Sequence, residues 1–424
     1  MAGWRSLLAD TRPLREPAFR RLWVASIITV VGAQLTVVAV PAQLYAITGS
    51  SAYVGLAGVF GLVPLVVFGL WGGALADVFD RRTLLIVTTL GLIGTSALFW
   101  LQALFGNRDP WLLLGLFALQ QAFFAVNHPT RNAIIPRLVP ADQLPAANSL
   151  SMTVFQGGAI AGPLIGGALI PVLGFAWLYL ADTVTLLATL SAALALPRLP
   201  IQGVVTTPGL RSVLEGLRYL RGHPVLLMSF LVDLIAMIFG MPRALFPEMA
   251  HLSFGGPSEG GLAFALLFAA IPAGAVLGGV LSGWVSRVER QGYAVVVAII
   301  AWGLAMVGFG LAAGAADGRA GPFLALAVLM LVLGGAADMS SAAFRMSMLQ
   351  SAVSDEVRGR LQGVFIVVVA GGPRIADVAH GSAAVVVGTT VAAAGGGLLV
   401  VVLTLVAALA VPAFVRYRVA PASG

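Results

Sequence analysis

A small group of ionisable side chains lies inside long apolar stretches of the sequence. The group consists of Asp182, Asp233, Asp338, Arg345, Arg374, Asp377 and His380. At the centre of a membrane-spanning helix, a charged side chain costs roughly 2.5–3.5 kcal/mol. Each of these groups therefore needs an ionic partner, a water-filled cavity or a function. Buried carboxylates of this kind are typical of sites that bind protons or charged substrates.

Arg374, Asp377 and His380 follow one another at helical spacing, so they share one helix face. A carboxylate that alternates between a dehydrated site and an arginine partner changes its proton affinity. We expect Asp377, with Arg374 as its partner, to load and release a proton, and Asp338 is the next candidate. The alternative is a static ion pair that joins two helices. For Asp182 the alternative is a residue in contact with outer water. The further candidates for proton or substrate binding are Asp182, Asp233, Arg345 and His380.

The composition indicates what kind of protein positions these groups. The chain has 424 residues, of which 59% are hydrophobic and 10% charged, and its mean hydropathy is +0.99. Soluble domains carry about 25% charged residues, so this is an integral membrane protein. Because the sequence has neither cysteine nor lysine, disulfides, thiolate chemistry and a lysine-dependent P-loop are excluded. The net charge of +7 is explained by basic cytoplasmic loops rather than by nucleic-acid binding.

Apolar runs separated by Gly, Pro and charge clusters predict twelve membrane-spanning helices. Six lie in the first half, near residues 20–46, 51–76, 82–105, 110–130, 144–170 and 175–196. Six lie in the second half, near residues 225–248, 260–285, 292–315, 322–348, 361–386 and 390–415. We expect the eleventh of these to be interrupted at Gly371, Gly372 and Pro373.

The two halves predict two six-helix bundles. Gly162-Pro163 in the first half recurs as Gly372-Pro373 in the second, among other matches that keep the same order. The predicted division is 1–196 for the first bundle, 197–224 for a cytoplasmic linker with an amphipathic helix, and 225–424 for the second bundle. If both termini are cytoplasmic, most arginines fall on the inner side, as the positive-inside rule requires.

The loop from Gly73 to Arg82 resembles the signature loop of the major facilitator superfamily. In that family, the matching Gly73, Asp77, Arg81 and Arg82 imply a cytoplasmic latch between the halves. The sequence departs from the family pattern at Val78 and Asp80. An ordinary charged turn is the alternative.

The predicted fifth span contains glycines four residues apart, Gly158, Gly162 and Gly166, next to Pro163 and Gly167. Such a face allows two helices to pack closely, and Pro163 is expected to bend the helix. The segment also resembles the antiporter motif of major facilitator exporters. The alternative is plain helix packing without a bearing on export.

Three further segments carry a narrower resemblance: Asn127 to Pro140, Gly216 to Pro224, and Asp355 to Arg360. They are similar to the major facilitator branch of enterobactin exporters and related siderophore and macrolide exporters. The resemblance implies an all-α transporter in a bacterial inner membrane that exports a small organic compound by proton-driven alternating access. It implies no enzymatic activity, no cofactor or metal, no nucleic-acid partner, and a monomer in the lipid bilayer.

The cargo that this branch implies is a catecholate-type siderophore. A multidrug or macrolide antiporter is the first alternative, and a non-transporting sensor or partner protein is the second. A trianionic catecholate needs free arginines, such as Arg345 or Arg374, whereas a cationic drug needs unpaired carboxylates, such as Asp233 or Asp338. The remaining polar candidates for a cavity wall are Gln34, Gln120, Gln121 and Gln156. The fourth span lacks the arginine common in proton-coupled relatives.

Overall fold

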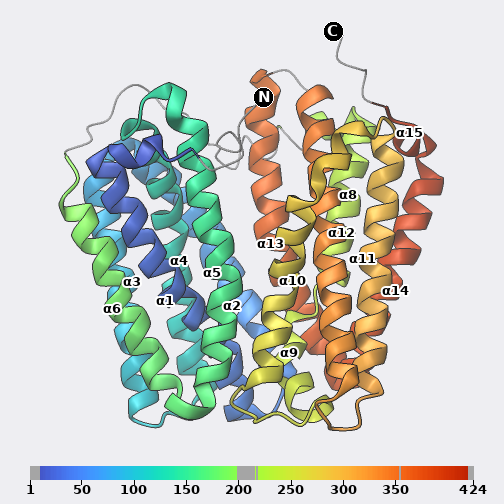
Figure 1. The fold of residues 1–424 in the computed structure, drawn as a ribbon, viewed down its shortest axis with the longest axis horizontal. Coiled ribbons are helices and arrows are strands. Elements are labelled where there is room, and N and C mark those ends of the chain that lie inside the picture. The colour runs from blue at the N-terminus through green and yellow to red at the C-terminus, as the bar shows by residue number, and fades with distance from the viewer. Residues whose placement is uncertain (1–9, 198–214, 216–217, 353–354, 419–424) are drawn as a thin grey trace, which may run out of the picture. The chain divides into compact units, whose positions relative to one another are not determined.

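The computed structural model describes residues 10–197, 215, 218–352 and 355–418, with only the backbone described at residues 70–78, 286, 350–352, 355–367, 369 and 370. Within these residues the chain forms helices and no β-strand (Figure 1). Six long helices belong to the first half: α1 (Pro17–Thr48), α2 (Ser51–Val78), α3 (Arg81–Leu104), α4 (Pro110–Ile134), α5 (Leu144–Leu173) and α6 (Phe175–Leu194). The second half has α8 (Pro224–Phe239), α10 (Leu262–Val280), α11 (Gln291–Gly314), α12 (Pro322–Ala352), α13 (Asp355–Val387) and α14 (Thr389–Ala410).

Most of these helices are long enough to span a membrane, and α8, with 16 residues, forms a candidate span of Pro224–Ser253 together with the turns that follow it. Among the described residues, 11 helices are long and apolar enough to cross a membrane. The remaining long helix, α13, has 33 residues, which exceeds the roughly 20 needed for a span. The all-α membrane fold is therefore confirmed, and the expected count of twelve is approximately met.

The structure corrects the expected continuity of two predicted spans. The sequence predicts one helix over 225–248, but α8 ends at Phe239. A short 3-10 turn, η5 (Arg243–Leu245), and α9 (Phe246–Glu248) follow instead. Pro242 has no N–H to donate and disfavours the helical conformation of the residue before it, while Gly240 adds a flexible position.

The other wrong prediction concerns the eleventh span, because α13 continues through Pro373 without interruption. A proline is tolerated in a membrane helix when its neighbours satisfy the freed backbone groups. Gly372 lies directly against Met237 of α8, where a Cβ would come within 2.8 Å of the Met237 Cβ. Gly372 therefore allows α13 to pack closely against α8. The amphipathic helix predicted in the linker lies largely outside the described residues.

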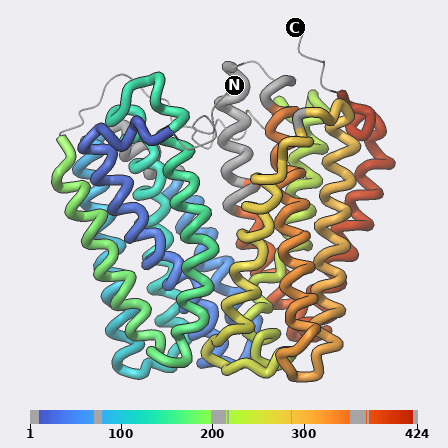
Figure 2. Tube along the Cα trace, in the orientation of Figure 1, coloured from blue at the N-terminus to red at the C-terminus, as the bar shows by residue number. Residues whose placement is uncertain are grey.

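The helices group into two compact units (Figure 2). Unit 1 contains Met1–Val40 and Val63–Thr207, and unit 2 contains Pro41–Leu62 and Pro208–Gly424. The end of α1 and the start of α2 thus group with the C-terminal helices. The chain leaves unit 1 next to Pro41, which lies inside α1, and returns to it next to Pro64, which lies inside α2.

Glycines explain why the start of α2 belongs to unit 2. A side chain at Gly55 or Gly58 would collide with the backbone carbonyls of Asp377 or Arg374 on α13. The N-terminus of α2 is also held in unit 2, because the Glu248 carboxylate accepts hydrogen bonds from the Ser51 N–H (3.1 Å) and the Ser51 hydroxyl (2.6 Å). A carboxylate at this position satisfies free amide groups and favours the helix dipole.

In unit 1 the glycine face of α5 packs against α1. A Cβ at Gly158 would collide with Val30, and one at Gly162 would collide with Gln34. Gly166 faces Leu35, and Pro163 and Gly167 are buried beside it. The spacing of four residues therefore places all three glycines on one helix interface, as small-residue packing in membranes requires.

Gly162→Ala is expected to lower the free energy of unfolding by about 1–3 kcal/mol, because the added methyl group overpacks the contact with Gln34. Gly157→Ala on the same helix is the control, since nothing lies within 4 Å of its Cβ position. The control is expected to be neutral or slightly stabilising, because alanine favours helices. Denaturant unfolding in detergent micelles measures both. Equal stability of the two variants would contradict the close α1–α5 contact.

Candidate functional site

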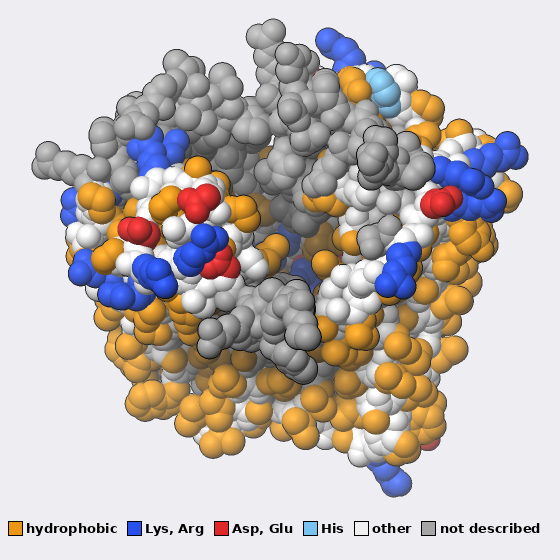
Figure 3. Space-filling model, turned by 45° about the horizontal axis from the view of Figure 1, so that its top comes forward, with side chains coloured by type: hydrophobic (Ala, Val, Ile, Leu, Met, Phe, Trp, Pro, Cys, Tyr) orange, Lys and Arg blue, Asp and Glu red, His pale blue; other side chains and the backbone are white. Residues whose placement is uncertain are grey.

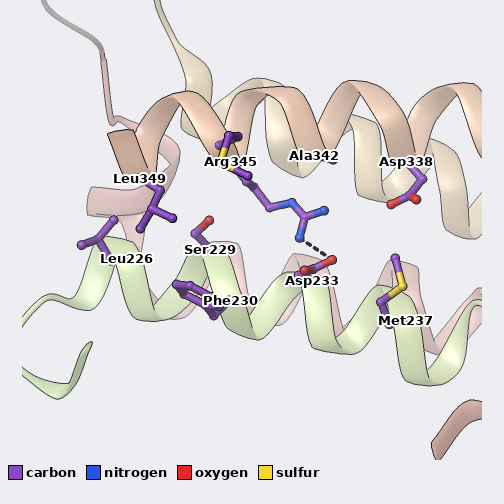
Figure 4. A pocket seen from close by; sticks show the side chains of 10 residues that line it. Leu226, Ser229, Phe230, Asp233, Met237, Asp338, Ala342, Arg345 and Leu349 are labelled. Carbon is purple, nitrogen blue, oxygen red and sulfur yellow. Dashed lines mark ion pairs between the residues drawn. The ribbon is translucent and has the colours of Figure 1, made fainter. Parts of the chain in front are cut away.

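A cavity of about 180 Å³ lies within unit 2 between α8 and α12 (Figure 4). Asp233 on α8 and Asp338 and Arg345 on α12 supply its ionisable lining. Asp338 and Arg345 are seven residues apart, which is two helical turns, so both point from α12 toward the cavity. Three of the ionisable residues singled out in the sequence therefore meet at one place.

Arg345 and Asp233 form an ion pair across the cavity. Their side chains are only 11% and 3% exposed, so water screens the pair little. The Arg345 Nε also donates to the Ser341 carbonyl oxygen at 3.3 Å. Removing either partner would leave an uncompensated buried charge, which is strongly destabilising. Arg345 is thus neutralised by Asp233.

Asp338 differs from Asp233 in having no ion-pair partner among the described residues. In the part of the chain that the structure describes, its carboxylate makes no hydrogen bond and no ion pair. With both carboxylates ionised and Arg345 charged, the cavity carries one net negative charge. A net negative charge in the cavity favours the binding of a cation or a proton over the binding of an anion.

Asp377 lies in a more crowded electrostatic environment on α13. An Arg243 Nη atom lies 3.9 Å from its carboxylate, and Arg374 and His380 are near enough to interact with it electrostatically. Arg243 lies within the predicted span 225–248, and the sequence gives no sign of this pairing. His380 is 4% exposed, and its Nδ1 lies 3.1 Å from the Ala376 carbonyl oxygen. Asp377 is therefore well compensated.

Asp182 lies in unit 1 and is 1% exposed. Its Oδ2 accepts hydrogen bonds from the hydroxyls of Thr36 (2.6 Å) and Ser96 (3.0 Å), so the carboxyl group joins α1, α3 and α6. Its Oδ1 is buried without a hydrogen-bond partner among the described residues. This burial argues against the alternative of a residue in contact with outer water. Elsewhere in the described residues, no three His, Asp or Glu side chains are grouped to hold a metal ion.

Comparison with known proteins decides the family. The profile of the family described as "Transmembrane secretion effector" matches residues 8–422. The chain belongs to this family of major facilitator transporters. The chain is 31% identical over 356 residues to an enterobactin exporter, EntS, of Shigella boydii, covering 82% of this chain and 81% of the relative. EntS of Citrobacter koseri is 30% identical over 359 residues, with the same shares.

Solved structures support the same fold for this chain. The nucleoside transporter NupG superposes with a TM-score of 0.72 at 15% identity, covering 95% of this chain and all of NupG. A bacterial homologue of the iron transporter ferroportin gives a TM-score of 0.69 at 15% identity, covering 94% and 98%. Major facilitator transporters are not enzymes, as the sequence predicts.

The arginines of the family's signature loop bind helix ends within unit 1. Arg81 donates to the Ala133 carbonyl oxygen near the end of α4 (3.0 Å), and Arg82 donates to the Leu194 carbonyl oxygen at the end of α6 (2.7 Å). Cations at helix C-termini satisfy free carbonyls and the helix dipole. For Gly73 and Asp77 only the backbone of α2 is described, so the latch that they imply stays a prediction.

The glutamine candidates do not line the cavity between α8 and α12, because all four belong to unit 1. Gln34 faces Gly162 at the α1–α5 contact. Gln120 and Gln121 lie on α4, and Gln156 lies on α5. Asn127 of α4 donates to the Thr88 and Thr89 hydroxyls on α3 at 2.9 and 3.0 Å, so its amide joins these two helices.

Asp233→Ala is expected to lower the free energy of unfolding by about 3–5 kcal/mol, because it leaves the Arg345 charge buried and unpaired. Arg345→Met is expected to act similarly. The double variant is expected to regain most of the loss, because neither member of the ion pair is then left buried without the other. Thermal unfolding of the purified variants in detergent measures the stability of the two single variants and the double variant, which together form a double-mutant cycle. Strictly additive losses would show that the two side chains do not interact.

Proposed function

We propose that this transporter exports a small organic compound from the bacterial cytoplasm by proton-driven alternating access, and that Asp338 is the carboxylate that binds the proton. One observation carries the proposal: Asp338 lines a cavity without a partner, whereas Asp233 is paired with Arg345. A carboxylate in a poorly hydrated cavity gains stability when it takes up a proton, unless a cation compensates it.

The cavity supports proton binding better than cargo binding. Drug-sized ligands occupy pockets of about 300–1,000 Å³, and the cavity between α8 and α12 holds about 180 Å³. Proton uptake by Asp338 would change the net charge of the cavity from negative to neutral, and the ion pair between Arg345 and Asp233 would be retained. Such a change in the charge of the cavity alters the relative stability of states that differ in hydration. Asp377, surrounded by Arg243, Arg374 and His380, ranks second as the coupling residue.

For the cargo we propose a catecholate-type siderophore, because curated relatives at 30–31% identity are named enterobactin exporters. The second candidate is a cationic or amphiphilic drug or a macrolide. The net negative charge of the cavity favours this candidate, since Arg345 is not free to bind an anion. The arginine distribution supports both termini in the cytoplasm, and the two-bundle division and a monomeric state in the inner membrane belong to the same proposal.

Asp338→Asn is expected to abolish cargo-triggered proton flux, because the amide cannot take up a proton. Purified protein in liposomes with a pH-sensitive dye inside, under an imposed pH gradient, measures the flux as siderophores and macrolides are added in turn. Asp317→Asn is the control, because it makes the same change in the exposed turn after α11, and it is expected to retain the flux.

Two outcomes would contradict parts of the proposal. Flux that survives in Asp338→Asn but is lost in Asp377→Asn would place proton coupling on α13. The absence of flux with every compound would remove the proton-driven exporter and favour a non-transporting sensor. The compound that triggers flux distinguishes the siderophore from the drug as cargo.

A further inference from the structure

A second groove lies in unit 1, between α1 and the C-terminal part of α6. Its volume is about 370 Å³. The α1 side is formed by Arg20, Arg21, Val24 and Ile28, together with Ala25. The α6 side is formed by Ala188, Ser191 and Ala192. Charged and apolar side chains thus share one groove.

The shape of the groove follows from the side chains along each helix. Arg20, Val24 and Ile28 are four residues apart, so they form a ridge along α1. Ala188 and Ala192 are also four apart on α6 and carry only methyl groups. The small α6 side chains leave space beside the α1 ridge. The space therefore runs along the helices, with cations at one end and apolar side chains beyond them.

The two arginines have no ionic partner in the described part of unit 1. Both are exposed, and neither makes an ion pair or a side-chain hydrogen bond with a described residue. Arg12, a few residues earlier, shows the contrast, because it pairs with Asp10 at 2.7 Å and lies 3.7 Å from Asp142. On the face drawn in Figure 3, basic side chains gather in the upper part of the view, and hydrophobic side chains cover the flanks below them.

The apolar wall of the groove faces outward. Val24 and Ile28 are 45% and 44% exposed, as expected of residues that contact lipid chains in a membrane protein. A ligand of this groove must therefore combine an anionic group for Arg20 and Arg21 with a hydrocarbon chain for Val24 and Ile28. Arginine forks match phosphate oxygens, and basic pockets between membrane helices bind acidic lipid headgroups.

We propose that the α1–α6 groove is a binding site for one acidic phospholipid. Arg20 and Arg21 hold its phosphate, and one acyl chain lies along Val24 and Ile28 against the alanine face of α6. The need for an acyl chain distinguishes this ligand from free phosphate, which has no hydrocarbon to contact the apolar end of the groove. The site is independent of the cavity at Asp338, because it lies wholly in unit 1.

Native mass spectrometry of the full-length protein in detergent tests the proposal. Phosphatidylglycerol is titrated against phosphatidylcholine with the same acyl chains. The double substitution Arg20→Gln and Arg21→Gln is expected to weaken phosphatidylglycerol binding about 30-fold, because each arginine near an acidic lipid contributes roughly fivefold. The matched control is Arg287→Gln with Arg290→Gln, which removes two exposed charges from unit 2 and is expected to retain binding.

Ala188→Leu tests the apolar half of the groove while both arginines remain. It is expected to weaken phosphatidylglycerol binding, because the larger side chain fills the space for the acyl chain. If the control pair weakened phosphatidylglycerol binding equally, the effect would be one of net charge alone, and the proposed lipid site would be overturned. Competition by inorganic phosphate, or full binding in Ala188→Leu, would indicate an anion site without a lipid chain and would also overturn it.

Discussion

The ion pair between Arg345 and Asp233 determines how charge is distributed in unit 2. Because the pair is buried, neither side chain is free to bind a charged ligand, and the cavity is left with Asp338 as its unpaired carboxylate. Arg345 also interacts electrostatically with Asp338 from two turns away on α12. The position of a single guanidinium therefore decides which of two aspartates is compensated and which remains available for proton binding.

The helices around this pair are held by contacts that leave little freedom. The C-terminal end of α8 is buried, and the Trp302 indole of α11 donates to its Ala236 carbonyl oxygen at 3.3 Å. Gly372 brings α13 against Met237, one turn from Asp233. Since unsatisfied backbone groups are costly in a membrane, these contacts fix where α8 can end. The end of α8 at Phe239 is thus stabilised by Trp302 and Gly372, close to the ion pair of Asp233.

Much of the fold is predictable from the sequence, because span length, apolar runs and the glycine spacing of α5 are local properties. The partners of the charged residues are not, since they depend on how distant helices pack. Arg374 and Asp377 share a helix face as the spacing indicates, but the ion pair of Asp377 is with Arg243, from the turn after α8 that the sequence does not predict. In the same way, the sequence does not predict that Arg81 and Arg82 donate to carbonyl oxygens at helix ends within unit 1.

The contact between Ser51 and Glu248 has a consequence for the order of folding. The two residues are 197 positions apart, so at a synthesis rate of about 5–20 residues per second the start of α2 waits roughly 10–40 s for its carboxylate. Its α13 neighbours are made later still. The earliest helices to enter the membrane therefore complete their packing among the last, and non-local closure of this kind slows folding. The start of α2 therefore stays in the membrane without its final contacts until Glu248 and α13 have been made.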